Sequence, residues 1–220
     1  MILAMGYSST RTANAMLVAG FFLYCLLTFN LKSTRIFSVI AVFLLLIILY
    51  APIYSNHAIN RFRTTFTAQN DDSYQLRVRN RNFIQPYIYS HPIGGGLGTT
   101  AGIGLTNNPG HFLAGFMPDS GYLMKVLETG IIGLIIVCFL YFFVLKQSVN
   151  GFFRVREPVL KTIYAGATAS LFTFYVGEYA QMALGQITDV VVYYPLIAIV
   201  MQADKFDNNS ETNSQAESNI

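Results

Sequence analysis

The sequence predicts an all-α, polytopic membrane protein with about five transmembrane helices and one large extracytoplasmic loop that carries short helices. Of its 220 residues, 53% are hydrophobic and 11% are charged, whereas soluble domains carry about 25% charged residues. The mean hydropathy is +0.45. The charges gather in short segments between long uncharged runs, and this distribution is typical of a chain that crosses a bilayer several times.

Two apolar runs near the start predict a first pair of spans. They cover residues 13–31 and 36–54, and each approaches the ~20 residues that cross a hydrocarbon core of about 30 Å. The link between them, which holds Lys32 and Arg35, is so short that we expect an antiparallel hairpin. Residues 1–54 are therefore predicted to form two transmembrane helices.

A polar or mixed stretch, residues 55–120, is the predicted extracytoplasmic loop. Within it, residues 75–89 have the pattern of an amphipathic helix that lies on the membrane surface. Residues 94–104 are so rich in glycine that we expect a loop there.

The apolar part that follows, residues 121–201, predicts three more transmembrane helices. The third span covers about residues 121–145, the fourth covers about 162–176, and the fifth follows a turn at 177–185. A polar link at 146–161 separates the third span from the fourth. Residues 202–220 are rich in Asn, Ser and Glu, a composition that predicts a disordered cytoplasmic tail.

The cations of the short links predict the orientation of the chain. When five spans alternate in direction, all of these cations fall on one side of the membrane: Lys32, Arg35, Lys146, Arg154, Arg156 and Lys161. By the positive-inside rule this side is cytoplasmic. The loop at 55–120 then faces the outside, where its own arginines are compatible with the rule because long loops translocate regardless of charge.

Several classes of function are excluded by composition. The net charge of +3 is small and divided, and no long basic run indicates nucleic acid as a partner. Cys25 and Cys138 lie inside predicted spans, where we interpret them as apolar filler rather than as a disulfide, zinc site or catalytic thiol. The sequence GLGTTA at 96–101 matches the pattern of a dinucleotide-binding fingerprint. That fingerprint requires a preceding strand, and none is predicted here. We therefore expect no cofactor and no metal.

Three arginines in the loop are the first candidates for binding. Arg77, Arg79 and Arg81 stand at alternate positions, which share one face of an extended segment but spread around a helix. Guanidinium groups pair with phosphate in a bidentate manner and never lose their proton. The cluster therefore suits a lipid pyrophosphate at the membrane surface, while a solvated face or contact with anionic headgroups is the open alternative.

Acidic residues provide the candidates for catalysis. Asp119 and Ser120 precede the third span, where either side chain is a ready N-cap. Alternatively, the Asp119 carboxylate acts as a general base toward a sugar hydroxyl. Glu128 lies about two turns into that span, where an acid is costly and faces the bundle interior, and Lys125 is its expected partner.

Three further side chains have open roles. His91 begins the turn HPIGGGLG, whose bare backbone permits close approach of a ligand, and its own role is expected to be structural. Glu178 and Asp189 flank the last outer turn. They either line the same cavity as the other acids or cap the helix ends.

The order of these motifs resembles the O-antigen ligase and polysaccharide polymerase family of bacterial membrane glycosyltransferases. That family has an Arg in its outer loop, then HPxxGxG, then His-Asn/Ser followed nine residues later by Gly-x-x-Gly. This chain has HPIGGGLG from His91 and DSGYLMKVLETGIIG from Asp119. Ser9-Thr10-Arg11 also looks like the Ser-Arg pair that opens an earlier span of the family. The resemblance covers about residues 9–145 and matches the C-terminal part of the family's members.

The resemblance implies transfer of a glycan from undecaprenyl pyrophosphate to an acceptor hydroxyl during surface polysaccharide assembly. The reaction would take place at the outer face of the bacterial inner membrane, without metal or nucleotide. The implied site residues are Asp119 or His111 as the base, Arg77, Arg81 and Arg11 for the pyrophosphate, and His91 and Glu128 in support.

Two departures from the family pattern refine this expectation. Asp119 stands where the ligases have His, which favours a polymerase or another acceptor. The chain has fewer predicted spans than the family's members, and we expect it to be the C-terminal half of a longer protein. Two other classes remain as hypotheses: a non-catalytic transporter or flippase subunit that binds a lipid-linked glycan, and a structural membrane partner with a headgroup-binding loop.

Overall fold

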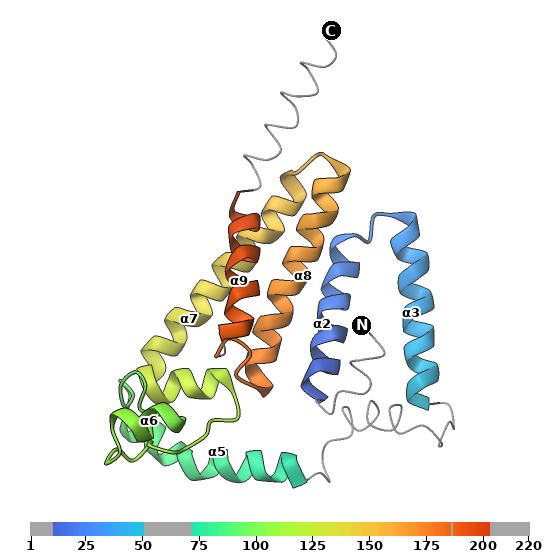
Figure 1. Cartoon of the computed structure of the whole chain (residues 1–220). Helices are drawn as coiled ribbons and strands as arrows, with labels where there is room; N and C mark the ends of the chain where they lie inside the picture. Colours follow the sequence, from blue (N-terminus) through green and yellow to red (C-terminus); the bar gives the residue numbers. More distant parts are fainter. Residues whose placement is uncertain (1–10, 51–71, 186, 203–220) are drawn as a thin grey trace.

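The computed structural model describes residues 11–50, 72–185 and 187–202, and the regular structure in these ranges is helical. The helices, labelled as in Figure 1, are α2 (Arg11–Leu27), α3 (Lys32–Tyr50), α5 (Asp72–Ser90), α6 (Ala101–Asn107), α7 (Gly121–Arg154), α8 (Pro158–Ala180) and α9 (Ile187–Met201). Within the described ranges, the one extended pairing is an isolated bridge between Ala101 and Ala114. The all-α prediction is therefore confirmed for this part of the chain. The predicted tail lies outside it from residue 203 onward.

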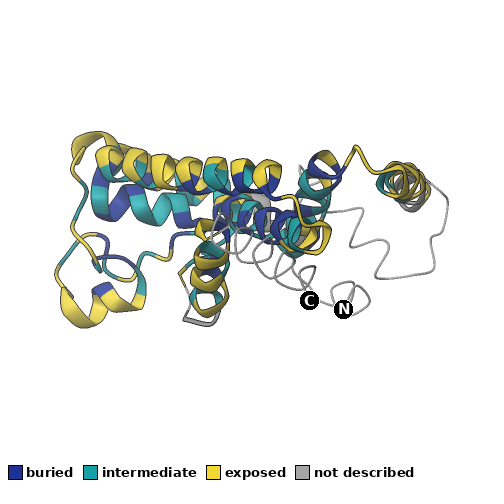
Figure 2. Cartoon of the chain, turned by 90° about the horizontal axis from the view of Figure 1, so that it is seen from above, coloured by how far each residue is buried: buried dark blue, intermediate teal, exposed yellow. Residues whose placement is uncertain are grey.

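Helix α8 lies at the centre of the bundle and packs against α2, α7 and α9. A Cβ added at Gly20 of α2 would lie 2.2 Å from Thr173 Oγ1 of α8, so the two helices approach closely there, as small residues permit in membrane bundles. The core between the helices includes Tyr141, Tyr164 and Leu171. Figure 2 shows buried residues where helices meet and exposed residues on the outer faces.

Two helices, α7 and α8, are long and apolar enough to cross a membrane, and Thr12–Leu27 and Asp189–Met201 are shorter apolar helices. Along α7, large apolar side chains are uncovered: Ile132 is 62% exposed, Ile136 63% and Phe143 58%. Apolar surface that the protein itself leaves uncovered is what lipid-facing helices present. The count of five spans stays a prediction.

Helix bounds differ from the predicted ones in three places. Helix α7 continues beyond residue 145 to Arg154, and α8 extends from Pro158 to Ala180, so the expected link at 146–161 is reduced to residues 155–157. Lys, Arg and Gln are good helix formers, and a polar sequence therefore does not end a helix. The predicted loop at 94–104 is wrong from Ala101 onward, where α6 begins after the extended residue Thr100. The helix predicted at 75–89 is confirmed as α5.

Helix α7 is broken at Gly130, which has φ +70° and ψ −172°. Figure 1 shows α7 turning sharply near its start. An α-helix bonds each N–H to the carbonyl four residues earlier, so a break at this point deprives the carbonyls of Leu127 and Glu128 of their normal partners. The short segment 121–129 thus takes a different direction from the long segment that follows.

The backbone of residues 92–96, which we call the glycine latch, satisfies the groups freed by this break. Two of its three glycine N–H groups donate to α7, Gly95 to the Leu127 carbonyl at 2.8 Å and Gly96 to the Glu128 carbonyl at 2.9 Å. In return, the Ile131 N–H donates to the carbonyl of latch residue 92 at 3.1 Å. Buried backbone groups need such partners, so the latch and the break stabilise one another.

Replacing Gly130 tests this arrangement. A Cβ there would lie 2.0 Å from the Pro92 carbonyl oxygen, and the φ/ψ pair is one that essentially only glycine adopts. We expect Gly130→Ala to lower the free energy of unfolding by about 3 kcal/mol, seen as a lower Tm of the purified chain in detergent.

Gly166→Ala in α8 is the matched control, because a Cβ there meets nothing within 4 Å. It should leave the Tm unchanged or raise it, since Ala favours a helix by up to about 1 kcal/mol over Gly. Equal Tm values for the two variants would contradict the latch.

Candidate functional site

Helix α5 presents two of its three arginines on one face. Arg77 and Arg81 are four residues apart and half-buried, whereas Arg79 is exposed on another side. Arg81 Nη1 donates to the Tyr179 hydroxyl at 3.3 Å, and its guanidinium carbon lies 5.1 Å from the centroid of the Tyr179 ring. The arginine face of α5 therefore contacts the last turn of α8.

Asp119 lies against the same helix. Asn80 Nδ2 of α5 donates to Asp119 Oδ2 at 3.0 Å. Ser120, not Asp119, is the N-cap of α7, because its Oγ accepts from the Leu123 N–H at 3.5 Å and donates to the Glu178 carbonyl at 2.9 Å. The carboxylate of Asp119 is therefore not used in capping.

Beneath Asp119, the start of α7 contacts the end of α8 through a buried carboxylate. Glu178 has a side chain that is 0% exposed and forms an ion pair with Lys125, whose side chain is 25% exposed. The Leu184 N–H donates to Glu178 Oε1 at 2.6 Å. A Cβ at Gly121 would lie 1.9 Å from Glu178 Oε2, so only glycine permits this approach.

The predicted pairing of Lys125 with Glu128 is wrong. Lys125 turns toward Glu178, whereas Glu128 accepts hydrogen bonds from the Thr100 N–H at 3.3 Å and the Thr100 hydroxyl at 2.5 Å. Glu128 is only 7% exposed. Its carboxylate thus ties the segment that follows the glycine latch to α7, which is a structural role.

Both candidate histidines lie near the latch, in an aromatic cluster around Tyr87. The His91 ring stacks on Tyr87 with centroids 4.0 Å apart, and His111 Nδ1 accepts from the Leu113 N–H at 3.2 Å. A Cβ at Gly95 of the latch would lie 2.8 Å from His111 Cε1. The Tyr87 hydroxyl is buried without a hydrogen-bond partner among the described residues, and this burial raises its pKa.

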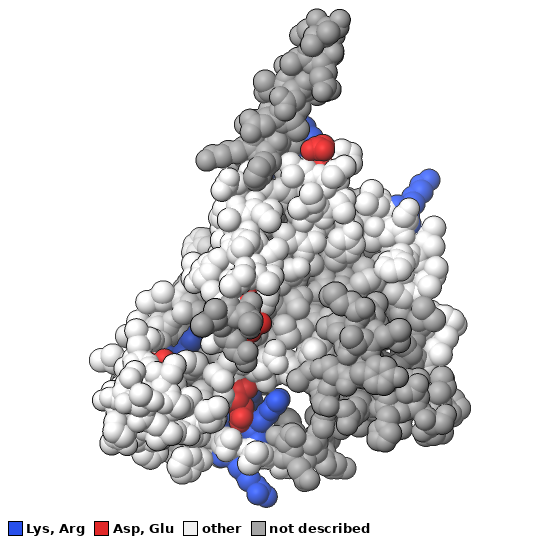
Figure 3. All heavy atoms as spheres, viewed as in Figure 1, with Lys and Arg blue, Asp and Glu red and all other residues white. Residues whose placement is uncertain are grey.

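The structure therefore divides the predicted site residues into two groups. One group, which we call the α5–α8 junction, consists of Arg77, Asn80, Arg81, Asp119 and Tyr179; the other lies at the latch and holds His91, His111 and Glu128. Figure 3 shows acidic side chains beside basic ones at the lower end of the molecule, next to α5. Sequence reasoning missed Asn80 and Tyr179, although the position of Asn80, three residues after Arg77 and therefore on the same helix face, was a signal.

Two predicted residues cannot be assigned to either group. Helix α2 begins at Arg11, whose side chain lies outside the described residues, and α9 includes Asp189, which is half-buried. Cys25 is buried, Cys138 is exposed, and both thiols are free.

One comparison with known proteins identifies a relationship. A family model described as O-antigen ligase matches residues 1–138, which is more than half of the chain. The match includes α5, the glycine latch, Asp119 and the break at Gly130. No curated protein and no solved structure matches the chain.

Removing the cation of the buried ion pair is expected to destabilise the junction of α7 with α8. Lys125→Met leaves the Glu178 carboxylate buried without its counter-charge, and breaking such pairs costs 3–5 kcal/mol. Because Lys125 is a quarter exposed, we expect the low end, about 3 kcal/mol, measured as a lower Tm in detergent.

Two further variants separate the ion pair from general effects of charge. Adding Glu178→Gln to Lys125→Met should recover part of the lost stability, because the unpaired buried charge is then gone. Lys146→Met removes an exposed cation of the same helix and should change the free energy of unfolding by about 0.5 kcal/mol or less. Equal losses for Lys125→Met and Lys146→Met would disprove the pairing.

Proposed function

The chain belongs to the O-antigen ligase family, and we propose that it transfers a glycan from undecaprenyl pyrophosphate to an acceptor hydroxyl at the α5–α8 junction. The observation that carries this proposal is the hydrogen bond between Asn80 of α5 and Asp119. This bond joins the Asp119 carboxylate, which precedes α7, to the helix that carries two half-buried arginines. A base and a cationic group are the two parts that such a transfer requires.

In this proposal the arginines bind the pyrophosphate of the donor. Arg77 and Arg81 share a face of α5, and their guanidinium groups keep their charge at any physiological pH. As the bond between the sugar and the pyrophosphate breaks, negative charge grows on the phosphate oxygens, and fixed cations stabilise that charge. The contact of Arg81 with Tyr179 restricts the position of one guanidinium before the donor arrives.

In this proposal Asp119 is the general base that activates the acceptor hydroxyl. Asn80 donates a hydrogen bond to Asp119 Oδ2. The other carboxylate oxygen, Oδ1, then accepts the proton of the acceptor hydroxyl. The freed hydroxyl oxygen attacks the anomeric carbon of the donor sugar, and a new glycosidic bond forms. The electron pair of the broken bond goes to the pyrophosphate oxygen, so undecaprenyl pyrophosphate leaves with its charge balanced by the arginines.

We assign His111 a structural role instead. Its Nδ1 accepts a backbone hydrogen bond, and its ring contacts the latch and Tyr87 rather than α5 arginines. Asp119 in place of a histidine favours an acceptor other than that of the ligases, and a second lipid-linked glycan, as in a polymerase, fits this change. The junction would face outward from a bacterial inner membrane.

The test uses membranes that contain the full chain, or the full chain with any in-frame spans that precede it, and a labelled glycan on undecaprenyl pyrophosphate. Asp119→Asn should lower product formation by at least about 100-fold, and Arg81→Ala by about 100- to 1000-fold. Arg79→Ala is the matched control, because this arginine is exposed on another side of α5, and it should keep most of the activity. Products are resolved by length on a gel.

Each outcome has a distinct meaning. Long chains that disappear with Asp119→Asn support a polymerase, and a single repeat transferred to its acceptor supports a ligase. A further outcome is that Arg81→Ala abolishes donor binding while no reaction depends on Asp119 or His111. That combination of results would replace the catalytic proposal with a binding function, that of a transporter or flippase subunit. Full activity of Asp119→Asn alone would remove Asp119 as the base.

A further inference from the structure

The chain between the middle of α5 and the start of α7 carries no charged side chain over a long distance. Residues 82–118, which we call the uncharged segment, include no Lys, Arg, Asp or Glu, although a stretch of this length in an average soluble domain would have about nine. The segment contains the end of α5, the glycine latch and α6. Figure 3 shows the same property on the surface, because the part of the molecule that holds α6 in Figure 1 is almost entirely white on the face in view.

Large apolar side chains of the uncharged segment lie on its surface rather than in a core. Ile93 of the latch is 77% exposed, and Leu97, just after the latch, is 81% exposed. Six more large apolar side chains of the segment are over half exposed: Phe83, Tyr89, Ile103, Leu105, Phe112 and Met117. Exposed apolar surface on this scale marks a contact with a membrane or with another protein.

This apolar surface begins where the exposed apolar surface of α7 begins. Ile93 lies at the break in α7, since a Cβ on Gly130 would be 2.7 Å from the Ile93 Cα. The next two residues of α7, Ile131 and Ile132, are exposed, and they start the long part of a helix that can cross a membrane. The surface of the latch therefore continues a surface that faces lipid, and this continuity favours lipid over a partner protein as its cover.

The irregular backbone of the segment forms hydrogen bonds inside the protein, which entry into a bilayer requires. The Ala101 N–H donates to the Phe116 carbonyl at 2.9 Å, and the Ala101 carbonyl accepts from the Gly115 N–H at 3.1 Å. Between these residues, the Ala114 N–H donates to the His111 carbonyl at 2.9 Å. An N–H group that is already bonded to the protein loses no water partner when the segment leaves water, so insertion costs little at these positions.

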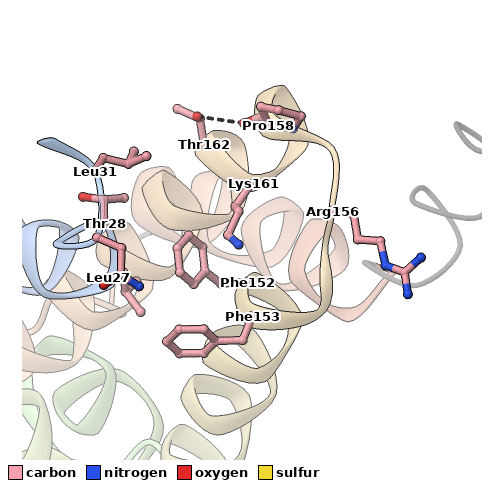
Figure 4. Close-up of a pocket in the computed structure, with 10 residues that line it drawn as sticks. Leu27, Thr28, Leu31, Phe152, Phe153, Arg156, Pro158, Lys161 and Thr162 are labelled. Atoms are coloured by element: carbon pink, nitrogen blue, oxygen red, sulfur yellow. Dashed lines mark hydrogen bonds between the residues drawn. The ribbon is translucent and has the colours of Figure 1, made fainter. Parts of the chain in front are cut away.

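The opposite end of the bundle has a different distribution of side chains. There, beside the α7–α8 link, the exposed Phe153 lines a cavity of about 330 Å³ together with Lys161 and Arg156 (Figure 4). Cations among apolar side chains are typical of helix ends that reach headgroups and water. The uncharged segment has no such cations, and contact with water therefore does not explain its surface.

We propose that the uncharged segment binds the surface of the bilayer, with the latch and α6 inserted where headgroups meet acyl chains, in the leaflet next to the α5–α8 junction. Segments in this zone bury their apolar side by about 5–10 Å, which removes side chains such as Leu97 and Ile103 from water. Since the segment includes the end of α5, its insertion also keeps that helix at the membrane surface. The partner is thus lipid, and the contact does not depend on glycan transfer.

The full chain in phosphatidylcholine vesicles tests this placement through the quenching of one fluorophore. Cys25→Ala and Cys138→Ser remove the two native thiols. In that background, Leu97→Cys or Ile103→Cys carries a nitrobenzoxadiazole label at a position whose own side chain is exposed. One quencher is a nitroxide on the upper part of the lipid acyl chain, and the other is iodide in the water.

Both labels should lose fluorescence to the nitroxide lipid and resist iodide. Ile132→Cys is the reference for contact with lipid, because it is exposed on α7 next to the break, and the losses at residues 97 and 103 should match its loss. Arg79→Cys is the matched control for contact with water, since this exposed arginine lies on another side of α5, and its label should be quenched by iodide.

Two results would overturn the proposal. Iodide quenching at residues 97 and 103 as strong as at residue 79, without loss to the nitroxide lipid, would place the segment in water. Resistance to both quenchers would show that protein, such as a second copy of the chain, covers the surface instead of lipid. Should Leu97→Cys fail to fold, Ile103→Cys gives the same comparison from α6.

Discussion

The hydrogen bonds between the glycine latch and the broken turn of α7 are the constraint on which the rest of the structure depends. An unbroken α7 would carry residues 121–129 onward along the axis of the span. The break at Gly130 instead gives this segment its own direction, and the latch supplies the partners that the helix has lost. Since an unsatisfied buried carbonyl or N–H costs about 1–3 kcal/mol, the break and the latch have to occur together.

A second constraint follows from the first, because the redirected segment must end against something. It ends against Glu178, which is fully buried and forms an ion pair with Lys125, while Ser120 donates to the carbonyl of the same residue. Gly121 leaves the space for this contact. Asp119 is the next residue toward the loop, and its position beside α5 is therefore fixed by a buried ion pair rather than by its own single hydrogen bond.

The sequence predicted the local features of this structure better than its long-range ones. Hydrophobic runs predicted where most helices lie, and the polar pattern at 75–89 predicted α5, because both depend on neighbouring residues. The partner of Lys125 was predicted wrongly, since Glu128 and Glu178 are equally plausible acids until the docking of α7 on α8 is known. The break at Gly130 was also not predicted, because a glycine in an apolar run shows nothing of its φ until the latch is seen to need it. Within the site, Arg77, Arg81 and Asp119 were identified by residue type, whereas Asn80 and Tyr179 became relevant only through contacts across the fold.

The cations of the α5–α8 junction are of a kind that suits the ligand proposed for it. A guanidinium presents several N–H groups in a planar fork, which matches the many oxygens of a pyrophosphate, and it stays charged when partly buried. Arg77 and Arg81 are half-buried on α5, and this burial restricts the positions of their guanidinium groups before the donor binds. These groups therefore lose less conformational freedom when charge develops on the donor. An ammonium group is a compact point charge on a flexible stem. Cations held in place, as the half-buried arginines of α5 are, therefore suit the stabilisation of developing charge that we propose for the junction.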